Sequence, residues 1–368
     1  LGTVQYFDGV EVGECGRTTP ESRDLQELLG AMRDNGCRGA VMEVSSHALV
    51  QDRVKSVRFE VGVFTNLSQD HLDYHRGIEA YYEAKALLFE QMAASSGRRG
   101  KAVVNIDDAY GRRLVKRFGE RLDLVTYGMG LKADFRALDV RCDFDGTRFK
   151  LEAKGREFLV RLPLIGKFNV YNALAAITTG NAMGVNLRES LGYLLDSPQV
   201  PGRLESVAGK KPFRVFVDYA HTPDALENVL ETLRDLEPNR LITVFGCGGE
   251  RDVTKRPLMG KVAERLSDVC IVTSDNPRDE DPNKILKDIT TGMRLERHAV
   301  IVDRAEAIRV AIGGAKGGDI VLVAGKGHET YQEIGGKRED FDDRKHAEWA
   351  LKDWVNPHMK RADGEEEA

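Results

Sequence analysis

Short apolar runs alternate with segments of helical periodicity along most of this chain. Three runs, AVMEVS (40–45), VGVFTN (61–66) and KAVVNI (101–106), are brief and rich in branched residues, as is typical of strands buried on both faces. Between the last two, residues 78–92 place apolar side chains at helical spacing. This repetition of strand and helix predicts an α/β fold with a mostly parallel sheet.

The stretch 133–162 has a different pattern. Polar and apolar residues alternate there around Asp145-Gly146, which is a strong hairpin signal. We therefore predict an antiparallel insertion or edge at this point, followed by a helix in KFNVYNALAAITTGNAMG (167–184).

A second α/β series begins near Pro201. Its predicted strands are FRVFVDYA (213–220), LITVFG (241–246), VCIVTSD (269–275), HAVIVD (298–303) and DIVLVAG (319–325). The segment SPQVPGRLE (197–205), rich in Pro and Gly, lies between the two series. We predict two domains, 1–200 and 201–368, of which the second is Rossmann-like.

Composition narrows the class of protein. A chain of 368 residues is too long for one core, and 41% hydrophobic with 31% charged residues is ordinary for a globular protein. A net charge of -5 argues against a nucleic-acid partner, and the five cysteines form no C-x-x-C pair. No apolar run approaches the roughly 18 residues of a membrane span, and no signal peptide opens the chain. We expect a cytoplasmic protein that does not insert into a membrane.

Polar clusters follow the strands of the first series, where ligands bind in open α/β sheets. The first cluster contains Glu43, Ser45, Ser46 and His47; the second contains Asn66, Asp70, His71, Asp73 and His75. A zinc-protease motif is excluded because Leu72, not Glu, follows His71. Glu43 and His71 are candidates for Mg²⁺, although the histidines could equally make local hydrogen bonds at a helix start. Lys85, on the helix that follows, is by spacing alone an ordinary surface charge.

The second series also carries ionic side chains after its strands. Asp218, Tyr219 and His221 precede a helix opened by Thr222-Pro223. The turn FGCGGERDVTKRPLMG (245–260), with Arg251, Lys255 and Arg256, suits a phosphate or carboxylate, or is a tight turn that needs glycine for φ > 0.

Two later segments, SDNPRDEDP (274–282) and VAGKGHE (323–329), pair turns with charges of both signs. Arg278 for a carboxylate and Asp275 for an ammonium would together suit an amino acid. Either segment alone could be a solvated loop.

Taken together, the motifs resemble the Mur ligase family, and within it the UDP-N-acetylmuramoyl-tripeptide synthetases (MurE). They occur in order as TTPES, EVSSHAL, TNLSQDHLDYH, YYEAKALLF, GKFNVYNALAA, GRLE, VDYAHTPDAL, FGCGGERD, DNPR and GKGHE. In this family DNPR distinguishes enzymes that add meso-diaminopimelate from those that add lysine. Its Arg is thought to meet the distal carboxylate, which lysine lacks.

The resemblance implies a role for each matching residue. Contacts to the substrate UDP-MurNAc-Ala-Glu would come from Thr18, Thr19, Ser45, Gln51 and Arg53. Mg²⁺ would be held by Glu43, His71 and Lys85, the last as a carbamate, which requires a neutral amine and so a lowered lysine pKa. ATP would be bound by Asn172, Arg203 and Asp218. Diaminopimelate would be held by Arg251, Asp275, Asn276, Pro277, Arg278, Gly325 and Glu329.

The implied reaction is ATP-dependent ligation in cytoplasmic peptidoglycan synthesis, and so in cell-wall formation and division. The carboxylate of the UDP-MurNAc-dipeptide attacks the γ-phosphate of ATP, and the amine of diaminopimelate then displaces phosphate from the acyl phosphate. Positioning and charge neutralisation would be the protein's main contribution, with domain closure as a natural step. The implied partners are these small molecules, and we expect a monomer.

The sequence departs from the family at one point. None of its six Gly-Lys pairs has a Gly five positions earlier, so the phosphate loop G-x-x-x-x-G-K-[ST] is absent from these 368 residues. We expect an N-terminally truncated chain that is inactive alone. Alternatives are a lysine-adding enzyme, another Mur-like ligase such as a folylpolyglutamate synthase or cyanophycin synthetase, and a non-catalytic diaminopimelate-binding protein. DNPR and the EVSSHAL, DHLDYH and GKGHE motifs favour the diaminopimelate-adding enzyme.

Overall fold

The computed structural model describes residues 1–68, 72–95, 99–130, 132–207, 209–294 and 298–355. These residues divide into two compact units. Unit 1 comprises Leu1–Arg141, Arg148–Leu162 and Phe168–Asp196, and unit 2 comprises Cys142–Thr147, Pro163–Lys167 and the chain from Ser197 onward. The predicted domain limit at residue 200 stays a prediction.

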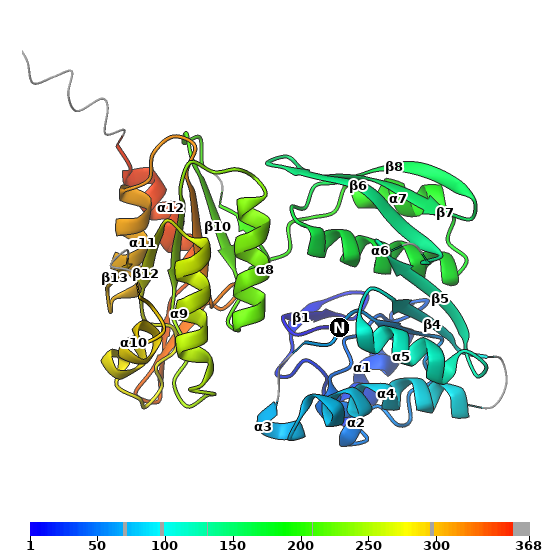
Figure 1. The fold of residues 1–368 in the computed structure, drawn as a ribbon. Helices are drawn as coiled ribbons and strands as arrows, with labels where there is room; N and C mark the ends of the chain where they lie inside the picture. The colour runs from blue at the N-terminus through cyan, green and yellow to red at the C-terminus, as the bar shows by residue number, and fades with distance from the viewer. Residues whose placement is uncertain (69–71, 96–98, 131, 208, 295–297, 356–368) are drawn as a thin grey trace, which may run out of the picture. The chain divides into compact units, whose positions relative to one another are not determined.

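Unit 1 is built on a six-stranded sheet in the order β3-β4-β5-β6-β7-β8, with a separate hairpin, β1-β2 (Figure 1). Its strands are β1 (Gln5–Phe7), β2 (Val12–Glu14), β3 (Val61–Phe64), β4 (Lys101–Asn105), β5 (Asp123–Gly128), β6 (Phe135–Asp143), β7 (Gly146–Ala153) and β8 (Arg156–Leu162). Its helices are α1 (Ser22–Asp34), α2 (Ser46–Val50), α3 (Leu72–His75), α4 (Ile78–Ala94), α5 (Ala109–Phe118), α6 (Lys167–Ala182) and α7 (Leu187–Leu195).

The parallel half of this sheet confirms two of the three predicted strands. β3 pairs with β4, β4 with β5, and β5 with β6, all in parallel. Their apolar side chains pack against α4, which confirms the predicted helix. The predicted strand 40–45 is wrong. Its backbone bonds with Leu1 at two points, Glu43 N–H to Leu1 O and the Leu1 amine to Val41 O, and Val41 is 88% exposed.

β6, β7 and β8 form the predicted antiparallel edge. Two residues join β6 to β7, and such a short link joins only antiparallel neighbours. The next turn has Lys154 and Gly155 both at positive φ (53° and 69°), as a type I′ hairpin requires.

Unit 2 is built on a six-stranded sheet in the order β13-β12-β11-β14-β10-β9. Its strands are β9 (Glu205–Ser206), β10 (Arg214–Asp218), β11 (Leu241–Phe245), β12 (Val269–Val272), β13 (His298–Val300) and β14 (Ile320–Ala324), with the hairpin β15 (Tyr331–Ile334) and β16 (Lys337–Asp340). Its helices are α8 (Pro223–Arg234), α9 (Lys255–Leu266), α10 (Pro282–Thr290), α11 (Arg304–Gly313) and α12 (Asp343–Asp353).

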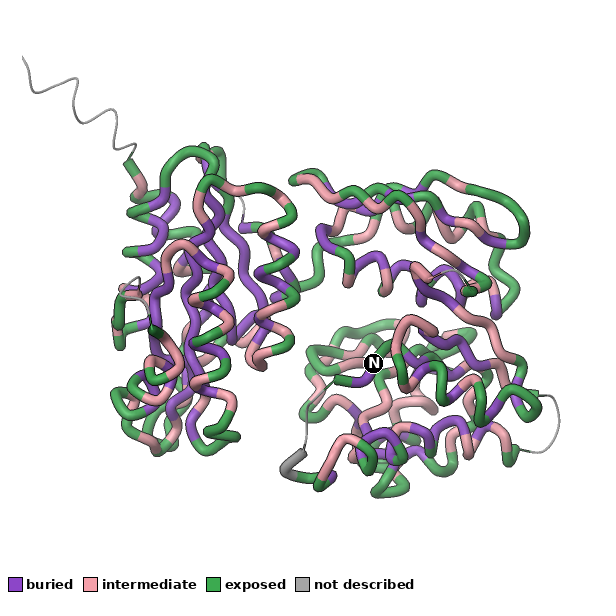
Figure 2. The backbone as a smooth tube through the Cα atoms, viewed as in Figure 1, coloured by how far each residue is buried: buried purple, intermediate pink, exposed green. Residues whose placement is uncertain are grey.

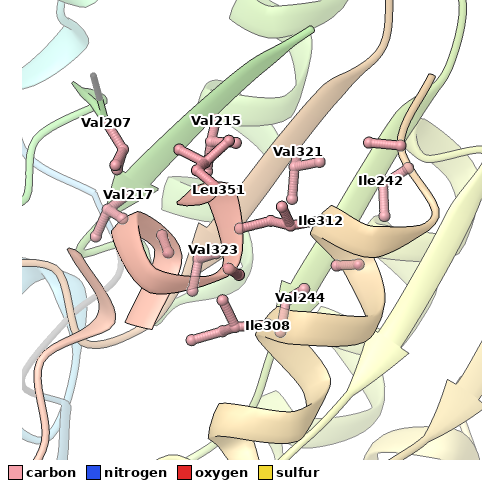
Figure 3. Close-up of a cluster of buried hydrophobic side chains, with 14 of the residues drawn as sticks. Val207, Val215, Val217, Ile242, Val244, Ile308, Ile312, Val321, Val323 and Leu351 are labelled. Atoms are coloured by element: carbon pink, nitrogen blue, oxygen red, sulfur yellow. The ribbon is translucent and has the colours of Figure 1, made fainter. Parts of the chain in front are cut away.

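Helices cover both faces of this sheet, so its central strands are buried throughout (Figures 1 and 2). On one face, α11 and α12 pack against side chains such as Val217, Val244 and Val323 (Figure 3). On the other, α9 packs between α8 and α10. Strands β10 to β14 are parallel and, in this sheet, only β9 is antiparallel, so the predicted Rossmann-like α/β arrangement is confirmed.

The described residues contain no helix that is both long and apolar enough to cross a bilayer.

Replacing Ile308 with Ala should lower the free energy of unfolding of unit 2 by about 2 to 5 kcal/mol, because the side chain is fully buried between α11 and the sheet. Chemical denaturation followed by circular dichroism measures this. Val310→Ala is the matched control on the same helix; that side chain is 40% exposed, and the change should stay within about 0.5 kcal/mol. Equal losses in the two variants would contradict the proposed packing.

Candidate functional site

Several residues predicted to contact the UDP-MurNAc-dipeptide form one hydrogen-bonded network in unit 1. Buried Thr19 donates its hydroxyl to the Glu43 carbonyl (2.9 Å) and accepts from Ser45 N–H (3.0 Å). The Thr3 hydroxyl donates to the Glu43 carboxylate (2.7 Å) and lies 3.1 Å from the Thr18 hydroxyl. Thr3 was not predicted from the sequence.

Arg53 joins the same network from the end of α2. It donates to the Thr19 carbonyl (3.0 Å), pairs with Glu21 (3.1 Å) and hydrogen-bonds the Gln51 side chain. Gln51 in turn donates to the Tyr74 hydroxyl (3.3 Å). The buried Arg53 Nε has no hydrogen-bond partner among the described residues. A donor left over in this way is available to a ligand oxygen.

A run of aromatic rings leads from α2 to Lys85 on α4. His75 Nε2 lies 2.8 Å from the Ser46 hydroxyl, and its ring stacks on Tyr81 at 5.1 Å between centroids. The Lys85 ammonium lies 4.8 Å from the centroid of the Tyr81 ring. Buried His75 is thus in contact with Ser46, a residue 29 positions away in the chain. Lys85 is half-buried rather than fully solvated.

His71 and Asp70 lie outside the described residues. Among those that are described, no cluster of three or more His, Cys, Asp or Glu side chains is arranged to hold a metal ion. The donor chemistry nevertheless fits Mg²⁺: the Glu43 carboxylate is exposed, and a carbamate on Lys85 would add a second hard oxygen ligand.

Of the residues predicted to bind ATP, Asn172 is an exposed position of α6 and donates to the Asn169 side chain (3.2 Å). Arg203 and Asp218 lie together in unit 2. The Arg203 guanidinium lies 5.0 Å from the centroid of the Tyr219 ring. Burial raises the pKa of Tyr219 to about 12.

Asp218 ends β10 and is almost fully buried. Its two carboxylate oxygens accept from Leu204 N–H (2.6 Å) and Ala220 N–H (2.7 Å). Burial raises the pKa of Asp218 to about 6, against the opposing effect of these two donors and of Arg203. The contacts fix the GRLE segment against the end of β10.

Asn276 and Glu329, two of the predicted diaminopimelate residues, meet around a fully buried lysine. Lys326 Nζ donates to Asn276 Oδ1 (2.8 Å) and to Glu329 Oε2 (3.1 Å). Asn276 Nδ2 completes the triangle with Glu329 Oε2 (2.9 Å). Lys326 was not singled out from the sequence, because a lysine in a glycine-rich turn is usually solvated.

Asp275 and Gly325 face each other beside this triangle. A Cβ on Gly325 would lie 2.5 Å from Asp275 Oδ2, and the Gly325 φ of 120° also disfavours any side chain. Asp275 is only 7% exposed, and its carboxylate has no hydrogen bond or ion pair with any other described residue. A buried carboxylate without a hydrogen-bonding partner is available to an ammonium group.

Arg278 is held by the β15-β16 hairpin. Its backbone bonds to Glu333 O (2.9 Å) and Gly335 N–H (2.8 Å). Its side chain donates to Gly249 O (2.6 Å) and pairs with the Glu333 carboxylate (3.3 Å). The hairpin thus orients the guanidinium, while the preceding Pro277 accepts from Glu280 N–H.

The glycines at the start of the turn 245–260 do not serve the positive-φ alternative that the sequence offered; the anion-binding alternative stays a prediction. Gly246 and Gly249 are not at positive φ. A Cβ on either would lie about 2 Å from a carbonyl oxygen, of Thr273 (2.1 Å) or Pro277 (1.9 Å), so glycine permits close approach to the DNPR segment.

The three cations of this turn have different environments. Arg251 is exposed, and Lys255 donates to His221 O (3.0 Å). Arg256 is fully buried and paired with Glu280 and Asp288 (both 2.9 Å), so it is structural.

Comparison with known proteins assigns the chain to a family. Residues 1–180 match the Mur ligase middle domain, and residues 202–327 match the Mur ligase glutamate ligase domain. The chain belongs to the Mur ligase family.

Individual relatives agree with this assignment. This Mur ligase is 45% identical over 354 residues to UDP-N-acetylmuramoyl-L-alanyl-D-glutamate--2,6-diaminopimelate ligase of Clostridioides difficile (strain 630), covering 95% of this chain and 72% of the relative. A solved structure of an enzyme of the same name is 38% identical with a TM-score of 0.64, covering 95% of this chain and 73% of that one. The MurF ligase of Thermotoga maritima in complex with ADP shares the fold at 17% identity and a TM-score of 0.65, with 91% of this chain and 73% of that chain covered.

The pKa of Asp218 makes the stability of this Mur ligase depend on pH. Between pH 3.8 and about 6 the unfolded chain releases this proton while the folded chain keeps it. Stability relative to Asp218→Asn, which does not titrate, should therefore fall by up to about 3 kcal/mol as the pH rises through this range. Urea denaturation of both proteins at several pH values measures the difference; a difference that stays constant, or grows with pH, would show that the carboxyl ionises normally.

Proposed function

We propose that this Mur ligase adds meso-2,6-diaminopimelate to UDP-N-acetylmuramoyl-L-alanyl-D-glutamate, with ATP hydrolysis to ADP and phosphate, in cytoplasmic peptidoglycan synthesis. The observation that carries the proposal is the environment of Asp275 in unit 2. This buried carboxylate has no partner among the described residues, and Gly325 leaves open the space in front of it. The relatives named for this reaction match over 95% of the chain.

The charges around Asp275 suit a diamino diacid. The Asp275 carboxylate matches an ammonium group, and Glu329 offers a second acceptor whose other contacts, Lys326 and Asn276, are already in place. The Arg278 guanidinium matches the distal carboxylate that diaminopimelate has and lysine lacks. Exposed Arg251, whose Cγ would lie 3.8 Å from a Cβ on Gly248, is available as a second cation for the substrate.

For unit 1, we assign the dipeptide substrate to Thr18, Thr19, Ser45, Gln51 and Arg53. The buried Nε of Arg53 has no hydrogen-bond partner in the part of the chain that the structure describes. Mur ligases use ATP and Mg²⁺. Glu43, His71 and carbamylated Lys85 would hold the Mg²⁺, which neutralises charge on the phosphate oxygens of ATP. The chain's own contribution is orientation: Thr3 and Thr19 fix Glu43, and the His75–Tyr81 stack supports Lys85. Asn172, Arg203 and Asp218 are the candidates for binding ATP.

Calorimetric titration of the full 368-residue chain with meso-diaminopimelate and with L-lysine tests the specificity. We expect meso-diaminopimelate to bind and lysine not to bind, because lysine leaves the guanidinium without its carboxylate. Arg278→Ala should weaken diaminopimelate binding by about 2 kcal/mol or more.

Arg338→Ala is the matched control for that titration, since Arg338 lies on the same hairpin, packs on Tyr331 at 4.3 Å and is exposed. It should leave the affinity unchanged. Tight lysine binding would indicate a lysine-adding enzyme, and binding of neither amino acid would overturn the assignment of this site.

Carbamylation of Lys85 is tested by incubating the protein with ¹³C-bicarbonate and recording its ¹³C spectrum. We expect a carbamate resonance that disappears in Lys85→Arg. Lys55→Arg, at an exposed lysine paired with Asp52, should leave that resonance in place. A wild-type spectrum without the resonance at neutral pH would remove Lys85 from the proposed metal ligands.

A further inference from the structure

Arg304 and Asp343 form a buried ion pair that no sequence motif indicates. Arg304 is the first residue of α11 and Asp343 the first of α12, and they are 1% and 0% exposed. The pair is bidentate, with Arg304 Nε to Asp343 Oδ1 and Nη2 to Asp343 Oδ2 both at 2.7 Å. Such a pair combines charge attraction with fixed geometry.

The same guanidinium also binds the backbone at two strand ends. Nη1 donates to Ser274 O (3.1 Å), just past β12, and Nη2 donates to Ala324 O (3.0 Å), the last residue of β14. β12 and β14 are not neighbours, because β11 lies between them in the sheet. Arg304 therefore sets the separation of two strand ends that the sheet's own hydrogen bonds do not join directly.

The residues that follow these two carbonyls belong to the amino-acid site. Asp275 follows Ser274, and Gly325 follows Ala324. A Cβ on Gly325 would lie 2.5 Å from Asp275 Oδ2 and 3.9 Å from Arg304 Nη2, so the cation is close to the unpartnered carboxylate. Asp343 and the two carbonyls engage all three guanidinium nitrogens, and no hydrogen bond joins Arg304 to Asp275 among the described residues.

We propose that the Arg304–Asp343 pair is a positioning device for the amino-acid site: it fixes Asp275 opposite Gly325 and keeps the Asp275 carboxylate unpaired for the ammonium of the substrate. This inference rests on the proposed function for the identity of the amino acid. Without Asp343, the Arg304 cation has Asp275 as a nearby alternative partner. An ion pair between them would neutralise the Asp275 carboxylate that the substrate's ammonium needs.

The chain offers a matched control at the opposite end of the same sheet. Arg240 and Asp319 directly precede β11 and β14, and Arg240 Nε lies 3.1 Å from Asp319 Oδ2. Asp319 is buried, and the pair joins two strands as Arg304 does, but at their amino ends. Loss of this pair should cost stability and leave the amino-acid site intact.

The test compares Arg304→Lys and Asp343→Asn with Arg240→Lys and Asp319→Asn in the full chain. All four variants should lower the melting temperature. Only the first two should raise the Kd for meso-diaminopimelate, by about tenfold or more, measured by calorimetry well below each melting temperature. An unchanged Kd in both Arg304→Lys and Asp343→Asn, or an equal rise in the control pair, would overturn the inference.

A double variant, Arg304→Met with Asp343→Leu, covers the case in which a lone buried charge prevents folding. Replacing both members of a buried pair with apolar residues is often tolerated. This variant should fold and still bind diaminopimelate at least about tenfold more weakly. Wild-type affinity in the folded double variant would contradict a positioning role.

Hydrogen exchange separates failure of this inference from failure of the proposed function. Arg304→Lys should speed amide exchange in residues 274–278 and 323–329, whereas Arg240→Lys should speed it near 240 and 319. If wild type does not bind meso-diaminopimelate, the proposed substrate is wrong, and this local pattern still decides whether Arg304 positions the two strand ends. Equal exchange at both ends in both variants would refute the positioning role.

Discussion

The parallel pairing of β10, β14, β11 and β12 is the constraint on which the proposed amino-acid site of unit 2 depends. Parallel strands bring their carboxyl ends to one edge of the sheet, so Asp218, Ser274 and Ala324 lead into segments that meet there. Each of these strands is buried on both faces. The buried strands therefore fix the backbone from which the side chains of the proposed site extend.

Buried charges then give this edge its chemistry. Lys326 holds the Asn276 and Glu329 side chains in place. Arg304 instead binds the Asp343 carboxylate and the carbonyls of Ser274 and Ala324. Asp275 differs because its carboxylate lacks a partner among the described residues. A buried ion pair such as Arg304–Asp343 is weak evidence of stability, because the cost of desolvating the two charges offsets their attraction. Its value here is in orientation, which suits the proposed site, where one carboxylate would distinguish two diamino acids.

The candidate site in unit 1 is held together by side-chain hydrogen bonds. The Thr19–Glu43–Ser45 network lies on a segment that is not a strand, and it is held by side chains such as Thr3 and Arg53 rather than by a sheet ladder. Carboxylate and hydroxyl oxygens supported in this way suit a phosphate-bound cation that keeps several of its own waters. The two units therefore use different means to position groups: hydrogen-bonded loops in unit 1, and buried ion pairs at strand ends in unit 2.

The sequence by itself determined the α/β class, the antiparallel edge at 133–162 and the family, and it proposed Asp275 and Arg278 as parts of an amino-acid site, because periodicity and local motifs depend on neighbouring residues. Only the tertiary structure decided the environment of each charge. Arg256 belongs to a structural ion pair, and Lys326 is buried. Arg304 pairs with Asp343, which is 39 residues away in the chain. The segment 40–45 is not a strand. The physical reason is that the fold decides which charged side chains meet, and local patterns in a sequence do not show which distant residue will lie within hydrogen-bond distance.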